Sequence, residues 1–559
     1  MSRTALPHRL TALFVLLGLV AAACGGGGDA DEQAEAPPPS EQGESGSSSE
    51  DDASEAGADT GQYPSATPIA EEGEYDPDAI FRWMYSVDAE NFDPTKISGV
   101  TPQMFLFPIY DTLTYVNPDV EVEPLLSDEW EILENGTILE MSLIEDWDFH
   151  DGEPFNATAV KANIERNQQE GAFAAPLLTS LTEIEVVDEY TVRLHTPDGS
   201  AATLLPTLSG AAGMMMSPLA FDNPGQDIAP IGGSGAFEMT NYVPGSVVEY
   251  TAVEDYWDPD ASRVAGMEFM ISGNDVARVN AVATGETDVT FLRATTIREA
   301  ETLLSDDLII LTKPTTATYH FGMNTARSEF GNLKVRQAVN HALDREAINE
   351  LLLEGLCTPT AQAMPDFFWA SSPDVPSDYY EHDPEKAREL LAEAGFPDGF
   401  EFDMGIANDG VFPLLGEAVQ AQLAEAGLRA NIILQESGDN RASFTTEKDI
   451  DSAFGSFRGE ADPAVTVAAV FLPDSSYNPG GYVSAEVERL AAEGRALTDQ
   501  AERAEVYHEL MKVAAEEAYP LANICTLSTP FFASSKVQGL QLFSDSQRRF
   551  RYVSIAADD

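Results

Sequence analysis

One short stretch of the sequence combines residue types that could do chemistry. In FHDGEPFNATAV, residues 149–160, His150 precedes Asp151, and Asn156 begins an Asn-x-Thr sequon. A His–Asp pair can serve as a general base only beside a nucleophile, and neighbouring side chains on a strand point to opposite faces. Asp151 and the glycine after it are a turn signal, and Asn156 is a favoured helix cap. We interpret the stretch as a turn that leads into a helix.

No other motif in the sequence is typical of catalysis or of metal binding. Phosphate loops, Cys-x-x-Cys pairs, His-Glu-x-x-His, Gly-x-Ser-x-Gly and dinucleotide fingerprints are all absent. The seven histidines are scattered without ligand spacing, and His341 and His508 are expected on the solvated sides of amphipathic helices. We predict no enzyme, no cofactor and no metal site. An exported hydrolase is the alternative, which hydrolysis of peptides would reveal.

Size and charge limit the class of protein. A chain of 559 residues exceeds one ordinary core, which predicts two or more lobes. Asp and Glu number 95 against 30 Lys and Arg, giving a formal charge of −65. This charge argues against nucleic acid as a partner and against adhesion to an anionic membrane by charge.

The N-terminus predicts export. Arg3 and Arg9 precede the apolar run LTALFVLLGLVAAA, which is typical of a signal peptide over residues 1–23. The run is short for a membrane span of about 20 residues, although an uncleaved anchor is the alternative. VAAAC resembles the lipobox of bacterial lipoproteins, with Ala21 where that motif usually has Leu. The resemblance implies lipidation of Cys24 and anchoring to the outer face of the bacterial cell membrane.

Composition changes sharply after Cys24. Residues 24–76 are rich in Gly, Ser, Pro and acids and have little to bury, so we predict a disordered acidic tether. The other two cysteines, Cys357 and Cys525, are a candidate disulfide because exported proteins keep such bonds.

The remaining sequence alternates strand and helix patterns. Asp383 and Gly395 are the expected cap and stop of one helix. These patterns predict an α/β chain with mixed sheets. The expected strands are 187–196 and 247–253, and the expected helices are 332–355 and 383–394, a helix-then-strand unit at 418–434, and two helices within 484–520.

Several motifs, taken in order, resemble the extracellular solute-binding proteins of family 5, which serve ABC importers for oligopeptides, dipeptides and nickel. WDFHDGEPFNATAVKANIER (147–166) resembles the family signature. The resemblance spans about 78–550. Further matching motifs are ENFDPT (90–95), IYDTLTY (109–115), EDYWDP (254–259), VNAVATGETDVT (279–290), the segment 321–348 and HDPEKARELLAEAGF (382–396).

The resemblance implies an α/β, two-lobed periplasmic-binding-protein-like fold of type II, in the large class with an extra subdomain. Mixed sheets form the lobes, and a hinge joins them near 312–320 and 520–530. The implied boundaries are lobe I at 77–315, containing the subdomain at about 105–230, lobe II at 316–525, and a return to lobe I at 526–559.

The implied function is that of a monomeric receptor. It would capture a small, peptide-like solute in the interlobe cleft and deliver it to ABC permease subunits driven by a cytoplasmic ATPase. An oligosaccharide or a nickel chelate is the alternative ligand. A surface lipoprotein that feeds no importer is the alternative class, which neighbouring genes would distinguish.

The resemblance also implies ligand residues. Dipeptide binders of the family hold the amino group of the peptide with an Asp in the motif W-x-x-D-x-x-D-P. The matching segment FRGEADPA has Phe457 in place of Trp and Glu460 in place of Asp, and its spacing to Asp462-Pro463 is one residue shorter. Their carboxylate-binding Arg is missing from the loop IANDGVFPLLGEAV, which offers Asn408; Arg441 or Arg458 could substitute. Trp369 is included because the face of an aromatic ring suits sugars or apolar side chains. The candidates are Phe92, Trp369, Asn408, Phe457, Arg458, Glu460 and Asp462.

Overall fold

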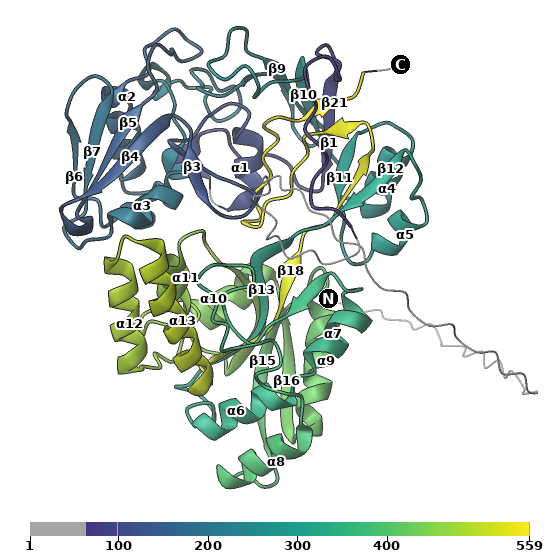
Figure 1. The fold of residues 1–559 in the computed structure, drawn as a ribbon. Helices are drawn as coiled ribbons and strands as arrows, with labels where there is room; N and C mark the ends of the chain where they lie inside the picture. Colours follow the sequence, from purple (N-terminus) through teal and green to yellow (C-terminus); the bar gives the residue numbers. More distant parts are fainter. Residues whose placement is uncertain (1–62, 98, 558–559) are drawn as a thin grey trace, which may run out of the picture. The chain divides into compact units, whose positions relative to one another are not determined.

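A computed structural model describes residues 63–97 and 99–557 (Figure 1). The predicted signal peptide, Cys24 and the first part of the predicted tether lie outside the described residues. Within the described part, three larger sheets organise the chain, and we call them sheets I, II and III. Lobe I denotes sheets I and III with their helices, and lobe II denotes sheet II with its helices.

Sheet I has β1 at its centre, parallel to both β10 and β11, while its other pairs are antiparallel. Aromatic residues such as Phe81 and Trp83 alternate along β1 and are fully buried in the core of lobe I. The strand order is β12 (Leu308–Leu311), β19 (Phe531–Ser534), β11 (Val289–Phe291), β1 (Ile80–Tyr85), β10 (Gly266–Ile271), β9 (Val247–Ala252) and β8 (Phe237–Val243).

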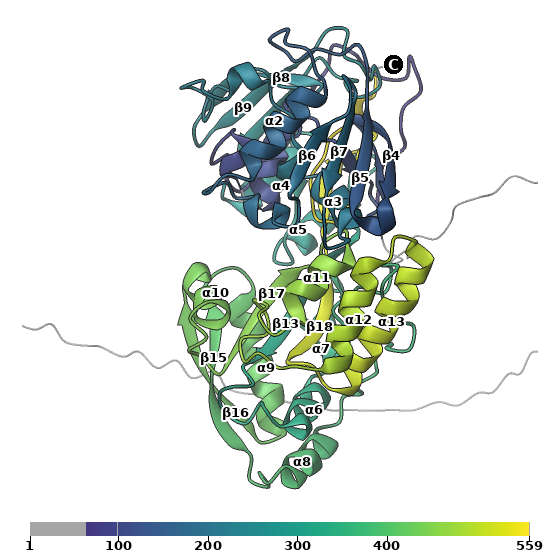
Figure 2. The ribbon, with the colours of Figure 1, turned by 90° about the vertical axis from the view of Figure 1, so that its left-hand side faces the viewer.

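Sheet II is also mixed, with β15 parallel to both β16 and β17. Its strand order is β14 (Cys357–Pro359), β18 (Leu521–Ser528), β13 (Pro314–Met323), β17 (Ser452–Arg458), β15 (Phe400–Ala407) and β16 (Leu428–Gln435). The helices of this lobe are α6 (Leu333–Ala342), α7 (Arg345–Leu352), α8 (Pro384–Glu393), α9 (Phe412–Glu425), α10 (Ser437–Thr445), α11 (Pro463–Val470), α12 (Ala485–Ala496) and α13 (Gln500–Glu516), of which α12 and α13 lie side by side (Figures 1 and 2).

Sheet III is a four-stranded antiparallel sheet with its own apolar core, in which β7 lies between β5 and β6. Its order is β4 (Ser127–Leu133), β5 (Ile138–Leu143), β7 (Thr191–His195) and β6 (Glu183–Val186). Lobe I also contains α1 (Val100–Leu106), α2 (Ala157–Asn167), α3 (Ala201–Thr207), α4 (Asp275–Ala283) and α5 (Ile297–Glu301), the short 3-10 helices η1 (Pro94–Lys96), η2 (Glu134–Gly136), η3 (Ala175–Leu178), η4 (Ala211–Gly213) and η5 (Pro218–Ala220), and the strand pairs β2 (Thr114–Val116) with β3 (Val122–Pro124) and β20 (Val537–Gln538) with β21 (Ser554–Ile555).

The chain passes between the lobes at two adjacent points. It leaves sheet I after β12 and enters sheet II at β13, and it returns from β18 to β19. The two connections are tied together where the Thr529 amide donates to the Lys313 carbonyl, 3.0 Å away. On the edge of sheet II, Cys357 of β14 and Cys525 of β18 form a disulfide. Paired connections of this kind are suited to a hinge.

Residues 63–76 depart from the predicted tether. The Thr67 amide donates to the Leu540 carbonyl at 2.8 Å, the Asp76 amide donates to the Ile555 carbonyl at 2.9 Å, and Ala70 is buried. The prediction of a disordered tether is therefore wrong for 63–76, because this segment pairs its backbone with the C-terminal segment of lobe I.

Most local signals hold, with three corrections. Asp383 caps α8 by accepting from the Lys386 amide, as predicted. The helix expected at 332–355 is two helices, because Asp344 caps α7 by accepting from the Ala347 amide. The strand expected from 187 begins at Thr191, after a turn closed by Asp188. His341 is buried, and its Nδ1 donates to the Glu381 carbonyl.

Candidate functional site

The His150 motif is a structural corner. Asn156 accepts from the amides of Thr158 and Ala159 and so caps α2, which confirms the turn-and-cap interpretation. The His150 Nε2 donates to the Gly235 carbonyl at 2.8 Å, and burial lowers the pKa of the imidazole, which favours its neutral form. The backbone approaches so closely that a Cβ on Gly233 would lie 2.7 Å from the His150 ring. His150 therefore joins segments of lobe I.

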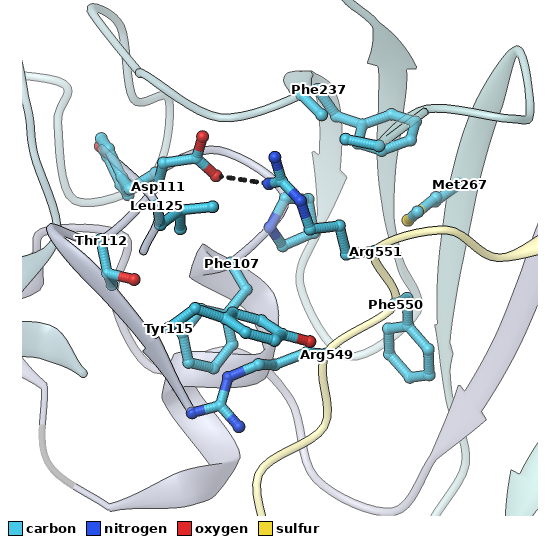
Figure 3. A pocket seen from close by; sticks show the side chains of 14 residues that line it. Phe107, Asp111, Thr112, Tyr115, Leu125, Phe237, Met267, Arg549, Phe550 and Arg551 are labelled. Atoms are coloured by element: carbon cyan, nitrogen blue, oxygen red, sulfur yellow. Dashed lines mark hydrogen bonds and ion pairs between the residues drawn. The ribbon is translucent and has the colours of Figure 1, made fainter. Parts of the chain in front are cut away.

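Two further signature motifs meet at a buried carboxylate in lobe I. Asp111, from IYDTLTY, accepts hydrogen bonds from Tyr256 and from the Trp257 indole at 3.1 Å. It also accepts from Arg551 at 3.1 Å (Figure 3). Arg551 also pairs with Asp258 at 2.7 Å. Burial raises the pKa of Asp111, and the adjacent Arg551 opposes this rise. The cavity beside the pair is about 40 Å³, room for a few waters, so this network is structural.

Two larger cavities are lined by residues of both lobes. The first, the Glu460 cavity, has a volume of about 260 Å³ and includes Gln103 of α1 and Gln547 from lobe I, with Arg458 and Glu460 from lobe II. The second, the Arg293 cavity, has a volume of about 630 Å³. It is lined by Arg293 and neighbouring residues of lobe I, by Tyr319 of lobe II and by the connections between the lobes.

Both cavities are lined in part by residues that directly follow the ends of strands. Arg293 follows β11, Asp409 follows β15, and Glu460 follows β17. Ligands of open α/β sheets bind outside the carboxyl ends of strands. The two cavities are therefore the best candidates for a solute site in the described part of the chain.

Glu460 lies in its cavity but is not free. Its side chain is 42% exposed, and its Oε1 accepts from the Arg458 guanidinium at 2.9 Å. Arg458 also donates to the Asp545 carbonyl in the returning segment of lobe I, at 3.1 Å. A cationic group of a solute would share the Glu460 carboxylate with Arg458 or displace it.

Three other predicted residues pack inside lobe II. The Asp462 carboxylate is buried, accepts from both the Ala464 amide and Arg503, and caps α11; it borders the Glu460 cavity. Phe457 is buried against His320 and Tyr477. Trp369 packs against Arg503, whose guanidinium carbon is 5.5 Å from the indole ring. Neither aromatic residue lines either cavity, because each faces the core around α11, α12 and α13.

Phe92 and Asn408 also lie outside the two cavities. Phe92 is fully buried in the core of lobe I, edge-on to Tyr242. Asn408 is exposed and donates to the Glu436 carboxylate at 2.9 Å. The residues after Asn408, from Asp409 to Val411, line the Arg293 cavity instead. The Asn408 loop therefore borders this cavity through the three residues that follow Asn408.

The candidates chosen from the sequence do not include Arg293. Its half-exposed side chain lines the Arg293 cavity and lies 3.4 Å from Asp275. Arg293 follows the end of β11, a strand that was not among those expected from the sequence. Arg441, considered as a substitute carboxylate ligand, lines neither cavity.

His320 is the most strongly shifted histidine of lobe II. It lies on β13, 2% exposed, between Phe457 and Tyr477. Burial lowers the pKa of His320 to about 3. Its Nδ1 has no hydrogen-bond partner among the described residues. The ring thus stays neutral at physiological pH.

Searches of the described residues for metal and membrane features were negative. Residues 63–97 and 99–557 contain no cluster of three or more His, Cys, Asp or Glu placed to hold a metal ion. No helix in the same ranges combines the length and apolar character needed to cross a membrane.

Comparison with known proteins fixes the family. The model described as "Bacterial extracellular solute-binding proteins, family 5 Middle" matches residues 121–478, more than half of the chain. The chain belongs to this family. A curated relative, the glutathione-binding protein GsiB of Salmonella typhi, is 26% identical over 441 residues, covering 76% of this chain and 85% of GsiB.

Solved structures of similar fold agree with the family. The periplasmic binding protein DppA of Helicobacter pylori, in complex with the peptide STSA, has a TM-score of 0.72 at 22% identity and covers 86% of this chain and 98% of its own. NikZ of Campylobacter jejuni, in complex with Ni(L-His), has a TM-score of 0.71 at 19% identity, with 86% and 100% coverage. These likenesses show the two-lobed binding-protein fold, as predicted.

Proposed function

We propose that this protein is the extracellular receptor of an ABC importer and that it captures a peptide-like solute between its lobes. Membership in family 5 supports the receptor role. The solute class is supported by relatives described as binding glutathione and the peptide STSA. The receptor presents the closed complex to a membrane permease, and it acts by binding, without catalysis.

The observation that carries the solute class is the charge of the two cavities. Each cavity is lined by charges of both signs. The Glu460 cavity has Glu460, Asp462 and Asp545 with Arg458 and Arg549, and the Arg293 cavity has Arg293 with Asp275 and Asp409. Both cavities draw their lining from both lobes, so a solute that reaches both would hold the lobes together. A peptide carries an amine at one end and a carboxylate at the other, so each end can meet a charge of opposite sign in these cavities.

The proposal extends to the membrane end of the chain. Signal cleavage before Cys24 and lipidation of this cysteine would anchor a monomeric receptor to the outer face of the membrane. Two or more lipid chains on one residue suffice for stable anchoring. Labelling with a radioactive fatty acid, with Cys24→Ala as the control, tests this part separately.

Native mass spectrometry of gently purified protein, from residue 57 onward, tests the solute class. A ladder of retained peptide masses is the expected result. A single sugar mass or a metal-chelate mass would replace the peptide assignment within the same receptor class. Hydrolysis of added peptides would instead indicate an enzyme.

Glu460→Gln tests the amine end of the site. We expect the affinity for the dipeptide Met-Leu to fall about 5- to 50-fold, because the variant removes a charge-assisted contact. The matched control is Glu486→Gln on α12, far along the chain in an exposed ion pair. Calorimetric titration measures both. Unchanged affinity of the Glu460 variant would remove this residue from the site.

A further inference from the structure

The segment 547–551, Gln-Arg-Arg-Phe-Arg, contains three arginines with different surroundings. Arg549 pairs with Asp545 at 2.9 Å, and Arg551 pairs with Asp111 and Asp258. Arg548 differs, because its Nε and Nη1 are buried without a hydrogen-bond partner among the described residues. The Arg551 Nε also lacks a partner, but Arg551 and Arg549 each form an ion pair, whereas Arg548 forms none among the described residues.

Aromatic rings hold Arg548 in place. Its guanidinium carbon lies 4.8 Å from the Tyr85 ring centre and 5.7 Å from the Phe291 ring centre. The two rings are themselves 4.8 Å apart. Tyr85 ends β1 and Phe291 ends β11, so both rings lie at the carboxyl edge of two parallel strands. Arg548 thus occupies the position where this fold class binds ligands.

Two further guanidinium groups share this platform, and that of Arg278 lies 4.6 Å from the Phe291 ring centre. Arg293 lies 5.5 Å from the same Phe291 ring, and it lines the Arg293 cavity. Its Nε is 3.4 Å from Asp275, whose Oδ1 already accepts from Arg278 at 2.6 Å. The neighbours of Arg548 in the chain, Gln547 and Arg549, line the Glu460 cavity. Arg548 therefore stands between residues that border the two cavities.

The charge of Arg548 is incompletely satisfied by the protein. A guanidinium stays protonated at any physiological pH, and burying its N–H groups without acceptors costs free energy. Stacking on aromatic rings offsets only part of this cost. The chain has 95 acidic residues, and yet none of the described ones pairs with Arg548. An acceptor supplied by a ligand would complete the site.

We propose that Arg548 and Arg293, on the Tyr85–Phe291 platform, bind a carboxylate of the transported solute. The planar guanidinium fork matches a carboxylate in geometry and in charge. This inference rests on the proposed function and names the group that replaces the missing carboxylate-binding Arg of the Asn408 loop. The carboxylate can come from a peptide C-terminus or from an acidic side chain.

Calorimetric titrations with defined probes test the subsite. Met-Leu carries a C-terminal carboxylate, its amide carries none, and Met-Glu amide carries only a side-chain carboxylate. In the wild type, we expect amidation of Met-Leu to weaken binding about 10- to 100-fold. Arg548→Gln should abolish this preference, and Arg548→Lys should keep part of it as a point charge. The control Arg489→Gln, exposed on α12, should behave as the wild type.

The probes separate the two carboxylate sources and the two levels of the proposal. If Arg548→Gln loses affinity mainly for Met-Leu, the subsite binds a C-terminal carboxylate. If it loses affinity mainly for Met-Glu amide, the subsite binds an acidic side chain. Equal binding of acid and amide by the wild type, or a preference that survives in Arg548→Gln, overturns the subsite and leaves the receptor role standing.

A peptide-independent measurement covers the case in which no peptide probe binds. Succinate is a small dicarboxylate, and its effect on the melting temperature can be compared between wild type and Arg548→Gln. If succinate raises the melting temperature of the wild type alone, the subsite is supported even though the peptide assignment fails. Equal behaviour of both proteins overturns the subsite as well.

Discussion

Two regions of lobe I contain buried or half-buried arginines, and they differ in how completely the charges are paired. One region centres on Asp111 and Arg551, and the other on Arg293 and Arg548. Around Asp111, each charge has a partner, and the adjacent cavity holds only a few waters. On the Tyr85–Phe291 platform, the guanidinium groups of Arg278, Arg293 and Arg548 lie over the rings. Arg278 and Arg293 pair with Asp275, whereas Arg548 has two buried N–H groups without acceptors and no ion pair among the described residues. The difference separates a network whose charges are paired within the fold from a guanidinium that has no acid partner among the described residues.

The two regions lie a few residues apart in the chain, on the segment that returns from lobe II. Arg551 ties this segment to other parts of lobe I through Asp111 and Asp258, and Arg549 pairs within the segment, with Asp545. Their pairing fixes the backbone on both sides of Phe550. Arg548 is thereby positioned by its neighbours while its own charge stays available. The stability of one region thus supports the binding proposed for the other.

The largest expected effect is on the paired region. Asp111→Ala should lower the free energy of unfolding by about 3–5 kcal/mol, because it leaves the buried Arg551 with an incomplete set of partners. Chemical denaturation monitored by tryptophan fluorescence measures the change. Asp260→Ala, an exposed ion-pair partner, is the control and should change stability by less than about 1 kcal/mol. A small effect of Asp111→Ala would show that the network is dispensable.

The disulfide should come next in size. Replacing Cys357 and Cys525 together by Ser releases a loop spanning 168 residues, which should cost about 2–4 kcal/mol. Cys357 also lines the Arg293 cavity, so the same variant sharpens the comparison. We expect lower stability measured by denaturation, but an intact preference for acid over amide. Loss of this preference would mean that the wall of the cavity, and not Arg548, sets it.

A pH effect of intermediate size should come from His320. Its pKa in the folded state is about 3, well below the ordinary value of 6.5. Between these values the unfolded chain binds a proton that the folded chain does not, so stability should fall as the pH decreases from about 6.5 toward 3. His320→Gln should flatten this slope in urea denaturation series. An unchanged slope would assign the acid sensitivity to other groups, such as His150.

Local chemistry in the sequence predicted much of this fold. Asp383, Asn156 and the turn at Gly152 act through backbone amides within a few residues, so their roles are legible in the sequence. The break at Asp344 was missed because a cap inside a continuous apolar pattern looks like part of one helix. The family motifs indicated both lobes and their connections.

The candidate site was less predictable, for a physical reason. Phe92, Phe457 and Trp369 are aromatic residues in plausible motifs, and only packing decides whether such side chains face a core or a cavity. Arg548 is recognisable only from what it lacks. Recognising it requires knowing that Tyr85 and Phe291 lie beside Arg548 and that no acid does. Tyr85 and Arg548 are more than 450 residues apart in the sequence.

The most direct test measures stability and binding in one variant, Arg548→Gln. Its free energy of unfolding should equal or slightly exceed that of the wild type, because an incompletely paired buried charge is removed. Its preference for Met-Leu over Met-Leu amide should disappear in the same preparation. A variant that is strongly destabilised and still prefers the free acid would contradict the central claim, because Arg548 would then belong with Arg551 among the residues that hold the fold.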